Sequence, residues 1–220
     1  MVYDNKCILM TASGGAVALI RISDFKTLYY AYAGKNTHSA DLLPDGNIVT
    51  ASSTDGVLRT FYTDTIAGTG TFAHEYKLPA AHNVYWDAKR SKLFTLTDHM
   101  TTFDYNGNRK DPALVNRREK KIDTQGRKVE SGHDLYPVHG EEDKLWMTTN
   151  EHVWKYDINT NKAEVVSDFY AVKSVSNIGK EVVMLRPDTE WWADHLIDAD
   201  GKVVFRIPGF KIYKARRILH

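Results

Sequence analysis

The chain has 220 residues, of which 42% are hydrophobic and 11% aromatic, so it can bury a core without a disulfide or structural metal. Lys and Arg number 29 against 28 Asp and Glu, and the resulting charge of +1 excludes a strongly basic nucleic-acid binder and an acidic disordered chain. No apolar run reaches the length of a membrane span, and no signal peptide is visible, so an extracellular or periplasmic location would require a signal that has been removed. The single cysteine, Cys7, cannot form an internal disulfide.

Short β-branched and aromatic segments alternate with turn sequences along the whole chain. In chain order, the predicted strands are residues 7–13, 16–22, 27–33, 47–52, 57–62, 72–78, 92–97, 101–105, 144–149, 152–157, 163–168, 181–186, 195–199 and 203–207. The turns between them include PDGN, TDG, YNGN, NTNK and ADGK, which carry the Asp, Asn and Gly that tight turns favour. No long stretch has the 3.6-residue apolar period of a helix, so the pattern predicts an all-β fold.

Five basic or imidazole residues recur at regular spacing, each just before a further predicted strand. These anchors are separated by 44, 51, 40 and 41 residues, and they are His38, His82, His133, Lys173 and Lys214. After each of the first four, one strand, a tight turn and three more strands follow. A period of 40–50 residues with four strands per unit is typical of a β-propeller, whereas an open β-sandwich would not give such regular anchors.

The chain ends predict how the propeller closes. Residues 7–36 supply only three strands, and Lys214 begins a single strand over residues 214–220. We therefore expect one β-propeller domain over residues 1–220, with five four-stranded blades and the C-terminal strand completing the N-terminal blade. The polar stretch 107–121 lengthens the third unit, as an extended loop or a longer outer hairpin.

Several segments carry a resemblance to a known family. HSADLLPDGNIVTASS, GHDLYPV, KLWMTTNEHVWKYD, KSVSN, RPDTEWW and YKAR resemble an uncharacterised family of bacterial propeller-like proteins, often exported by gut bacteria. The resemblance covers nearly the whole chain. It implies the propeller fold, and it implies six blades instead of five where members carry additional N-terminal sequence. It implies no particular chemistry.

The anchors suggest a site, because equivalent positions in successive blades point towards one axis. His38, His82 and His133 are candidate ligands for a divalent metal such as Zn, Mn, Fe or Ni, and we expect their imidazoles to converge. Two other interpretations stay open: a solvated polar channel, and histidines that donate hydrogen bonds to a ligand. Lys173 and Lys214 weaken the case for a cation and favour an anion at the same place.

Loops between the second and third strands of each blade open on the same face as the anchors. They contribute candidate ligand-binding residues, namely Asp55, His99, Asn150, Glu151, Arg186, Glu190 and Trp191. Tryptophan flanked by charged residues suits stacking on a sugar ring, with the polar groups fixing hydroxyls.

The sequence therefore predicts a monomeric protein that binds or processes an anionic glycan, or another small anion. If it is an enzyme, β-elimination on a uronate fits best, with a metal acidifying the proton and Lys173 or Lys214 as the base. Glycoside hydrolysis is disfavoured because it needs a carboxylate pair, which the anchors lack. The alternative is a non-catalytic interaction propeller that binds a protein partner through its rim loops.

Overall fold

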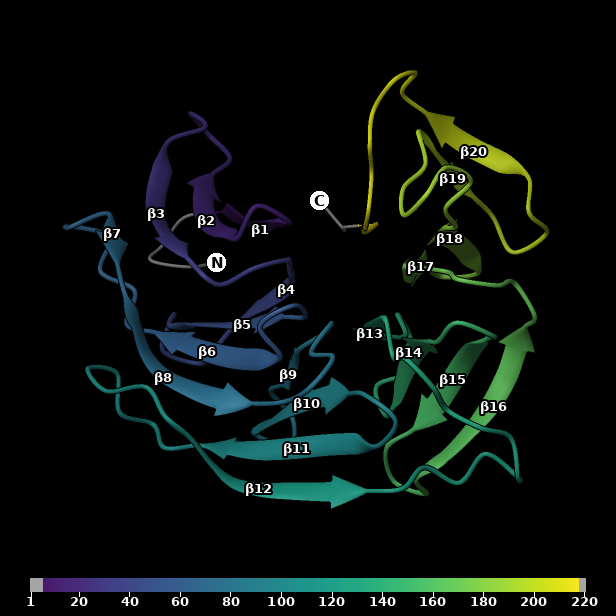
Figure 1. Ribbon diagram of the computed structural model, residues 1–220, viewed down its shortest axis with the longest axis horizontal. Coiled ribbons are helices and arrows are strands. Elements are labelled where there is room, and N and C mark those ends of the chain that lie inside the picture. Colours follow the sequence, from purple (N-terminus) through teal and green to yellow (C-terminus); the bar gives the residue numbers. More distant parts are fainter. Residues whose placement is uncertain (1–5, 218–220) are drawn as a thin grey trace. The chain divides into compact units, whose positions relative to one another are not determined.

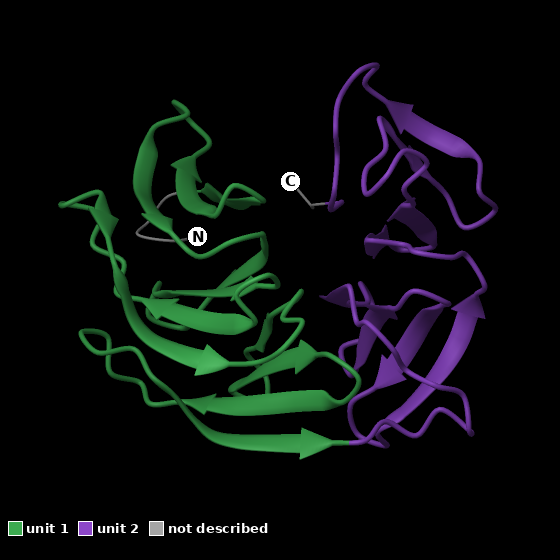
Figure 2. Cartoon of the chain, in the orientation of Figure 1, with its two compact units in different colours: residues 1–120 green, residues 121–220 purple. Residues whose placement is uncertain are grey.

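A computed structural model describes residues 6–217, and its regular structure is entirely β (Figure 1). The chain divides into two compact units, residues 1–120 and 121–220 (Figure 2). Among the described residues, no helix is long and apolar enough to cross a membrane. That one domain spans residues 1–220 stays a prediction.

Unit 1 contains three four-stranded sheets. The first sheet has the order β1 (Cys7–Ala12), β2 (Ala16–Arg21), β3 (Thr27–Tyr32) and β7 (Thr69–Gly70). The second has β4 (Thr37–Leu42), β5 (Ile48–Ser52), β6 (Val57–Phe61) and β8 (Phe72–Lys77). The third has β9 (Tyr85–Asp87), β10 (Lys92–Leu96), β11 (Met100–Tyr105) and β12 (Leu114–Lys120).

Unit 2 contains two more sheets of the same kind. One has β13 (Asp134–Pro137), β14 (Lys144–Thr148), β15 (Val153–Asp157) and β16 (Lys162–Ser167). The other has β17 (Ser174–Ile178), β18 (Glu181–Leu185), β19 (His195–Ile197) and β20 (Val203–Arg206). The five four-stranded sheets confirm the predicted β-propeller. Of the fifteen strand pairings in the described sheets, fourteen are antiparallel and one, between β3 and β7, is parallel.

Neighbouring sheets within each unit are joined by apolar side chains that alternate along the strands. Val17 and Leu19 from the first sheet pack with Ile48 and Phe61 from the second. In unit 2, Trp146 belongs to a cluster that also contains residues of β17, β18 and β19. The alternation of buried and exposed positions therefore places one face of a strand in an interface between sheets.

The predicted closure by the C-terminal strand is wrong within the described residues. The fourth strand of the first sheet is β7, which pairs in parallel with β3 through Tyr30 and Ala31. The segment after Lys214 runs beside β17 instead: the Ala215 N–H donates to Ser174 Oγ at 3.1 Å, and the Arg217 N–H donates to Ser176 Oγ at 2.9 Å. These side-chain acceptors fix the segment without a backbone ladder. Residues 218–220 lie outside the described part of the chain.

The first strands of consecutive sheets are tied by the same kind of side-chain acceptor. Asp41 in β4 accepts the Trp86 N–H of β9 at 2.7 Å, and Asp134 in β13 accepts the Val175 N–H of β17 at 3.2 Å. Ser39 Oγ similarly accepts the Val84 N–H at 3.2 Å. Because these strands belong to different sheets, such ties take the place of a β-ladder between them.

The polar stretch 107–121 forms the outer strand of the third sheet, β12, and thus a lengthened outer hairpin. Only its first residue, Leu114, is buried, and the remaining residues of the strand are exposed. Its basic side chains lie on this solvated surface, where Arg117 pairs with Glu119 at 2.5 Å.

Gly34 precedes β4 in a conformation that only glycine adopts easily, with φ of 119°. A Cβ there would lie 2.5 Å from Arg59 Nη1, 2.8 Å from Ser52 Oγ and 2.9 Å from Asp55 Oδ2. We expect Gly34→Ala to lower the free energy of unfolding by about 2–4 kcal/mol, measured by urea denaturation. Gly107→Ala is the matched control, since φ is 69° but nothing lies within 4 Å of the added Cβ. Equal losses in both variants would contradict the steric argument.

Candidate functional site

The two histidine anchors of unit 1 lie together. His38 is buried in β4, and His82 precedes β9. Their rings stack with centroids 4.8 Å apart and planes 7° from parallel. His82 Nδ1 lies 2.7 Å from the Ala80 carbonyl, so its N–H donates there and the lone pair is left on Nε2.

The anchors of unit 2 form a second cluster, around His133. His133 and Lys173 immediately precede β13 and β17, and backbone bonds to Thr148 O and Leu185 O extend these strands to include them. His133 Nε2 lies 2.9 Å from Lys173 Nζ and 2.6 Å from Asn150 Oδ1. The predicted residues His133, Lys173 and Asn150 are therefore in direct contact.

This contact constrains the protons. A proton on His133 Nε2 can be donated to Asn150 Oδ1, but a protonated Lys173 cannot then donate to the same nitrogen. With the Nε2 lone pair exposed instead, the ammonium of Lys173 donates to it. His133 and Lys173 are thus placed to hold one proton between them, which is the arrangement that an acid–base pair needs.

Lys214, the last anchor, is held by hydrogen bonds and an ion pair inside unit 2. Its Nζ donates to the His133 carbonyl at 2.6 Å and to Asp134 Oδ1 at 3.2 Å. Arg216 donates to the same carboxylate oxygen at 2.5 Å. Asp134 is 0% exposed, so two cations and a backbone N–H surround a fully buried carboxylate.

Burial and charge change the proton affinities in this cluster. Burial lowers the pKa of Lys173 to about 8, with repulsion from Lys214 as the second cause. Burial also lowers the pKa of Lys214 to about 8, against the attraction of Asp134. Burial by itself would raise the pKa of Asp134, but Arg216 and Lys214 outweigh it and hold that pKa below its usual range.

Trp191 extends the cluster to the surface. Its side chain is 62% exposed, and Lys173 Nζ lies 5.7 Å from the ring centroid, in cation–π range. Trp191 follows Glu190, whose φ of 53° is the left-handed conformation of a tight turn. The turn is closed by a bridge between Thr189 and Trp192. An exposed aromatic face thus lies next to a buried amine.

The other predicted ligand-binding residues have different surroundings. Asp55 accepts the Lys35 N–H at 3.0 Å and lies 3.5 Å from Arg59, so it has a structural role in unit 1. His99 lies 3.0 Å from Asp98 in an exposed turn. Arg186 covers the Phe169 ring at 5.4 Å, and Glu151 and Glu190 are exposed.

The metal expected from the three histidines stays a prediction. Among residues 6–217, no group of three or more His, Cys, Asp or Glu side chains is placed to hold a metal ion. Unit 1 contributes two imidazoles and unit 2 contributes one, next to a lysine. Metal analysis of the purified protein would test the prediction directly.

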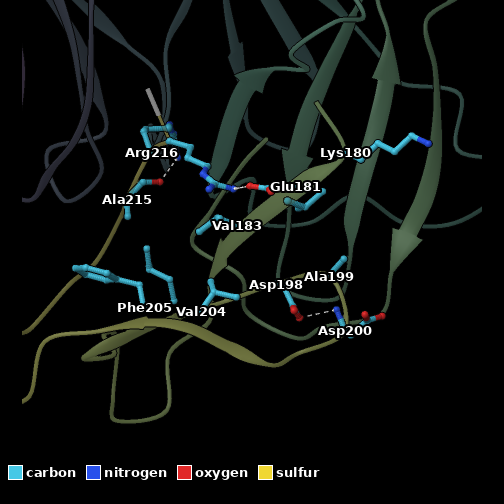
Figure 3. A pocket seen from close by; sticks show the side chains of 13 residues that line it. Lys180, Glu181, Val183, Asp198, Ala199, Asp200, Val204, Phe205, Ala215 and Arg216 are labelled. Carbon is cyan, nitrogen blue, oxygen red and sulfur yellow. Dashed lines mark hydrogen bonds and ion pairs between the residues drawn. The ribbon is translucent and has the colours of Figure 1, made fainter. Parts of the chain in front are cut away.

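Unit 2 contains a cavity that none of the predicted site residues line (Figure 3). Its volume is about 830 Å³, and it opens between the start of β18, the β19–β20 hairpin and residues 215–217. Val183, Val204 and Phe205 line it, with Asp198 and Asp200 along one side and Arg216 on another. It has a mostly apolar surface and contains none of the residues that the sequence singled out.

Sequence reasoning missed the roles of Asp134 and Arg216. Asp134 directly follows the His133 anchor, and Arg216 lies two residues after Lys214. The sequence did contain a signal: Asp134 and Asp41 are acidic residues that each lie in the first strand of a sheet, shortly after an anchor. Both have a partner in the next sheet, as their hydrogen bonds to Val175 and Trp86 demonstrate.

Comparison with known proteins supports the fold and assigns no activity. The profile of a family of unknown function, DUF6528, matches residues 1–220. The chain is similar to hydrazine synthase of Kuenenia stuttgartiensis, with a TM-score of 0.57 and 12% identity over 95% of this chain and 64% of that one. It is also similar to the C-terminal WD40 domain of Sif2, with a TM-score of 0.48 and 13% identity over 82% of this chain and 52% of that one. The chain thus spans less than two thirds of either structure. Comparison with curated proteins finds no match.

Proposed function

Because the chain belongs to DUF6528, a family of unknown function, we propose its activity from the residues of unit 2: it binds an anionic sugar at Lys173, His133 and Trp191. The sugar carboxylate would lie against the Lys173 ammonium, and a face of the sugar ring would stack on the exposed indole of Trp191.

The observation that carries the proposal is a buried cation without a counterion. Lys173 is 2% exposed, and within residues 6–217 no carboxylate forms an ion pair with it. Buried charges in proteins are normally paired, because an isolated ammonium loses its hydration without compensation. Lys214, by contrast, has Asp134 as its counterion. A carboxylate on a ligand would supply to Lys173 what Asp134 supplies to Lys214.

The same pair is suited to β-elimination if the bound sugar is a uronate. With a pKa of about 8, a fraction of Lys173 is neutral near neutral pH and can accept a proton. It would take the proton from the carbon next to the carboxylate. That C–H electron pair would form the ring double bond, and the glycosidic oxygen would leave with its bonding electrons and take a proton from solvent water. His133, 2.9 Å from Lys173, is placed to carry the accepted proton away.

The test is calorimetric binding of trigalacturonate, with maltotriose as a neutral trisaccharide of the same length. We expect Lys173→Met to weaken trigalacturonate binding at least tenfold, which is about 1.4 kcal/mol, because the ion pair is lost. Lys180→Met is the matched control, since Lys180 is exposed and lies in the same unit.

Two results would contradict the proposal. One is unchanged affinity in Lys173→Met. The other is a failure of both sugars to bind the wild-type protein, which would favour the interaction propeller that binds a protein partner. An unsaturated product absorbing near 235 nm, absent in the Lys173 variant, would identify the protein as a lyase.

A further inference from the structure

A second, smaller cavity is lined by Trp192, the residue that follows Trp191 in the sequence. Its volume is about 340 Å³, within the range of small-ligand sites. It combines aromatic, acidic and basic side chains, namely Trp192, Phe210, Asp188, Asp194, Arg206 and Lys211. None of these residues belongs to the site around Lys173.

Backbone contacts hold the walls of this cavity in place. Ala193 and Ile212 exchange two hydrogen bonds, of 3.2 Å and 3.0 Å, and the Ile207 N–H donates to the Asp194 carbonyl at 2.8 Å. The loop that contains the tryptophans is thereby joined to the segment after β20. The cavity is preformed, so a ligand would not have to order it.

The polar groups of the cavity retain hydrogen-bonding capacity. Asp194 Oδ1 lies 3.0 Å from His195 Nδ1 and 3.5 Å from Arg206 Nε, while its second oxygen has no such contact among the described residues. Asp188 Oδ2 lies 3.7 Å from the same imidazole nitrogen, and its side chain is about half exposed. Each carboxylate can still accept hydrogen bonds from neighbouring hydroxyls of a ligand.

The charge of the cavity favours a neutral ligand. Two carboxylates and two cations line it, so the lining has no net charge to select an anion. Phe210 is 60% exposed and offers an apolar face beside the carboxylates. An aromatic surface next to carboxylate acceptors suits the apolar face and the hydroxyls of an uncharged sugar.

The two tryptophans connect this cavity to the first site. Trp191 lies beside Lys173, at 5.7 Å, whereas Trp192 lies beside Lys211, at 4.9 Å. The Cα atoms of consecutive residues are about 3.8 Å apart, so the Trp191 and Trp192 side chains start from neighbouring points of the backbone. A ligand longer than one sugar could therefore contact both.

We propose that the Trp192–Phe210 cavity binds a neutral sugar residue linked to the acidic residue held at Lys173. The inference rests on the proposed function and makes it more specific. The ligand would be an oligosaccharide in which an acidic sugar is joined to an uncharged one. A homopolymer of uronates would fill only the first site favourably.

The test compares unsulfated chondroitin tetrasaccharide, which contains both kinds of sugar, with tetragalacturonate, which is acidic throughout. We expect the chondroitin tetrasaccharide to bind more tightly. Phe210→Ala should weaken its binding about tenfold and leave tetragalacturonate binding unchanged, because only the neutral sugar uses the aromatic face. Phe25→Ala is the matched control, since Phe25 is exposed and lies in unit 1.

Each other result has a definite meaning. If Phe210→Ala weakens both ligands equally, or neither, the neutral subsite is wrong. If Lys173-dependent binding of tetragalacturonate persists without any preference for chondroitin, the inference fails while the proposed function stands. If neither acidic ligand binds, the proposed function fails. In that case the neutral sugar site is tested by itself with methyl β-galactoside. Binding that depends on Phe210 would support the site, and absence of binding would contradict it.

Discussion

Replacing Asp134 with alanine should lower the free energy of unfolding by about 3–5 kcal/mol, the largest loss that we expect from a single substitution. The carboxylate is completely buried and accepts from Lys214, Arg216 and the Val175 N–H. Its removal leaves two partly buried cations and a backbone donor without their acceptor. Thermal and urea denaturation would measure the loss.

Two further substitutions separate the contributions of Asp134. Asp134→Asn keeps an acceptor for the Val175 N–H but removes the charge, so we expect an intermediate loss. Asp200→Ala, at an exposed position of the same unit, should change stability by less than about 0.5 kcal/mol. If Asp134→Ala were as mild as Asp200→Ala, the buried carboxylate would not organise this part of unit 2.

Raising the pH from 8 to about 9.5 should stabilise the protein, contrary to the usual trend for a protein with ordinary lysines. The pKa of Lys173 is about 8 when folded and 10.5 when unfolded, so in this window the unfolded chain binds more protons. Stability then rises with pH, by about 1.4 kcal/mol per pH unit for one lysine at most. Lys214, whose pKa is also lowered to about 8, contributes in the same direction. Nearer pH 10 and above, Tyr76, Tyr105 and Tyr213 oppose this effect, because burial raises the pKa of each phenol.

Lys173→Met should therefore increase stability near pH 7, by up to about 3 kcal/mol, while it weakens trigalacturonate binding. It should also reduce the rise in melting temperature between pH 8 and about pH 9.5. Lys180→Met should keep the wild-type pH dependence, because Lys180 is exposed. A wild-type melting temperature that falls across this window, in parallel with Lys173→Met, would contradict the burial of the amine.

The strand pattern and the repeat were accessible from sequence because they depend on local chemistry. β10 and β14 each combine a short, mostly apolar run with a nearby Asp- or Asn-containing turn, and both form where the pattern predicts. The position of β17 follows from the Lys173 anchor alone. Repetition made each assignment support the others.

The pairing of the first sheet was not accessible in the same way. β7 consists of Thr69 and Gly70, which carry no apolar period, and its parallel pairing with β3 depends on a contact distant in sequence. The C-terminal segment has strand-like residues, yet Ser174 and Ser176 fix it beside β17. A periodic pattern does not reveal which side chain will accept a given backbone N–H.

The candidate site was only partly predictable for a related reason. Spacing identified His38 and His82, which stack, and His133 and Lys173, which are in contact. Spacing could not distinguish the chemistry of the two lysine anchors, because Lys214 has a buried counterion and Lys173 does not. That difference comes from Asp134, whose partners lie about 80 residues further along the chain.

The ties between first strands also bear on how such a chain could change in length. Asp41 and Asp134 each lie in one repeat and accept a backbone N–H from the next, and every non-proline residue supplies such a donor. A tandemly duplicated repeat would therefore bring its own acceptor and find a suitable donor in whatever repeat follows. Gain or loss of a whole repeat would need no compensating substitution at this contact, so the number of blades could vary between related chains more readily than the sequence of any one blade.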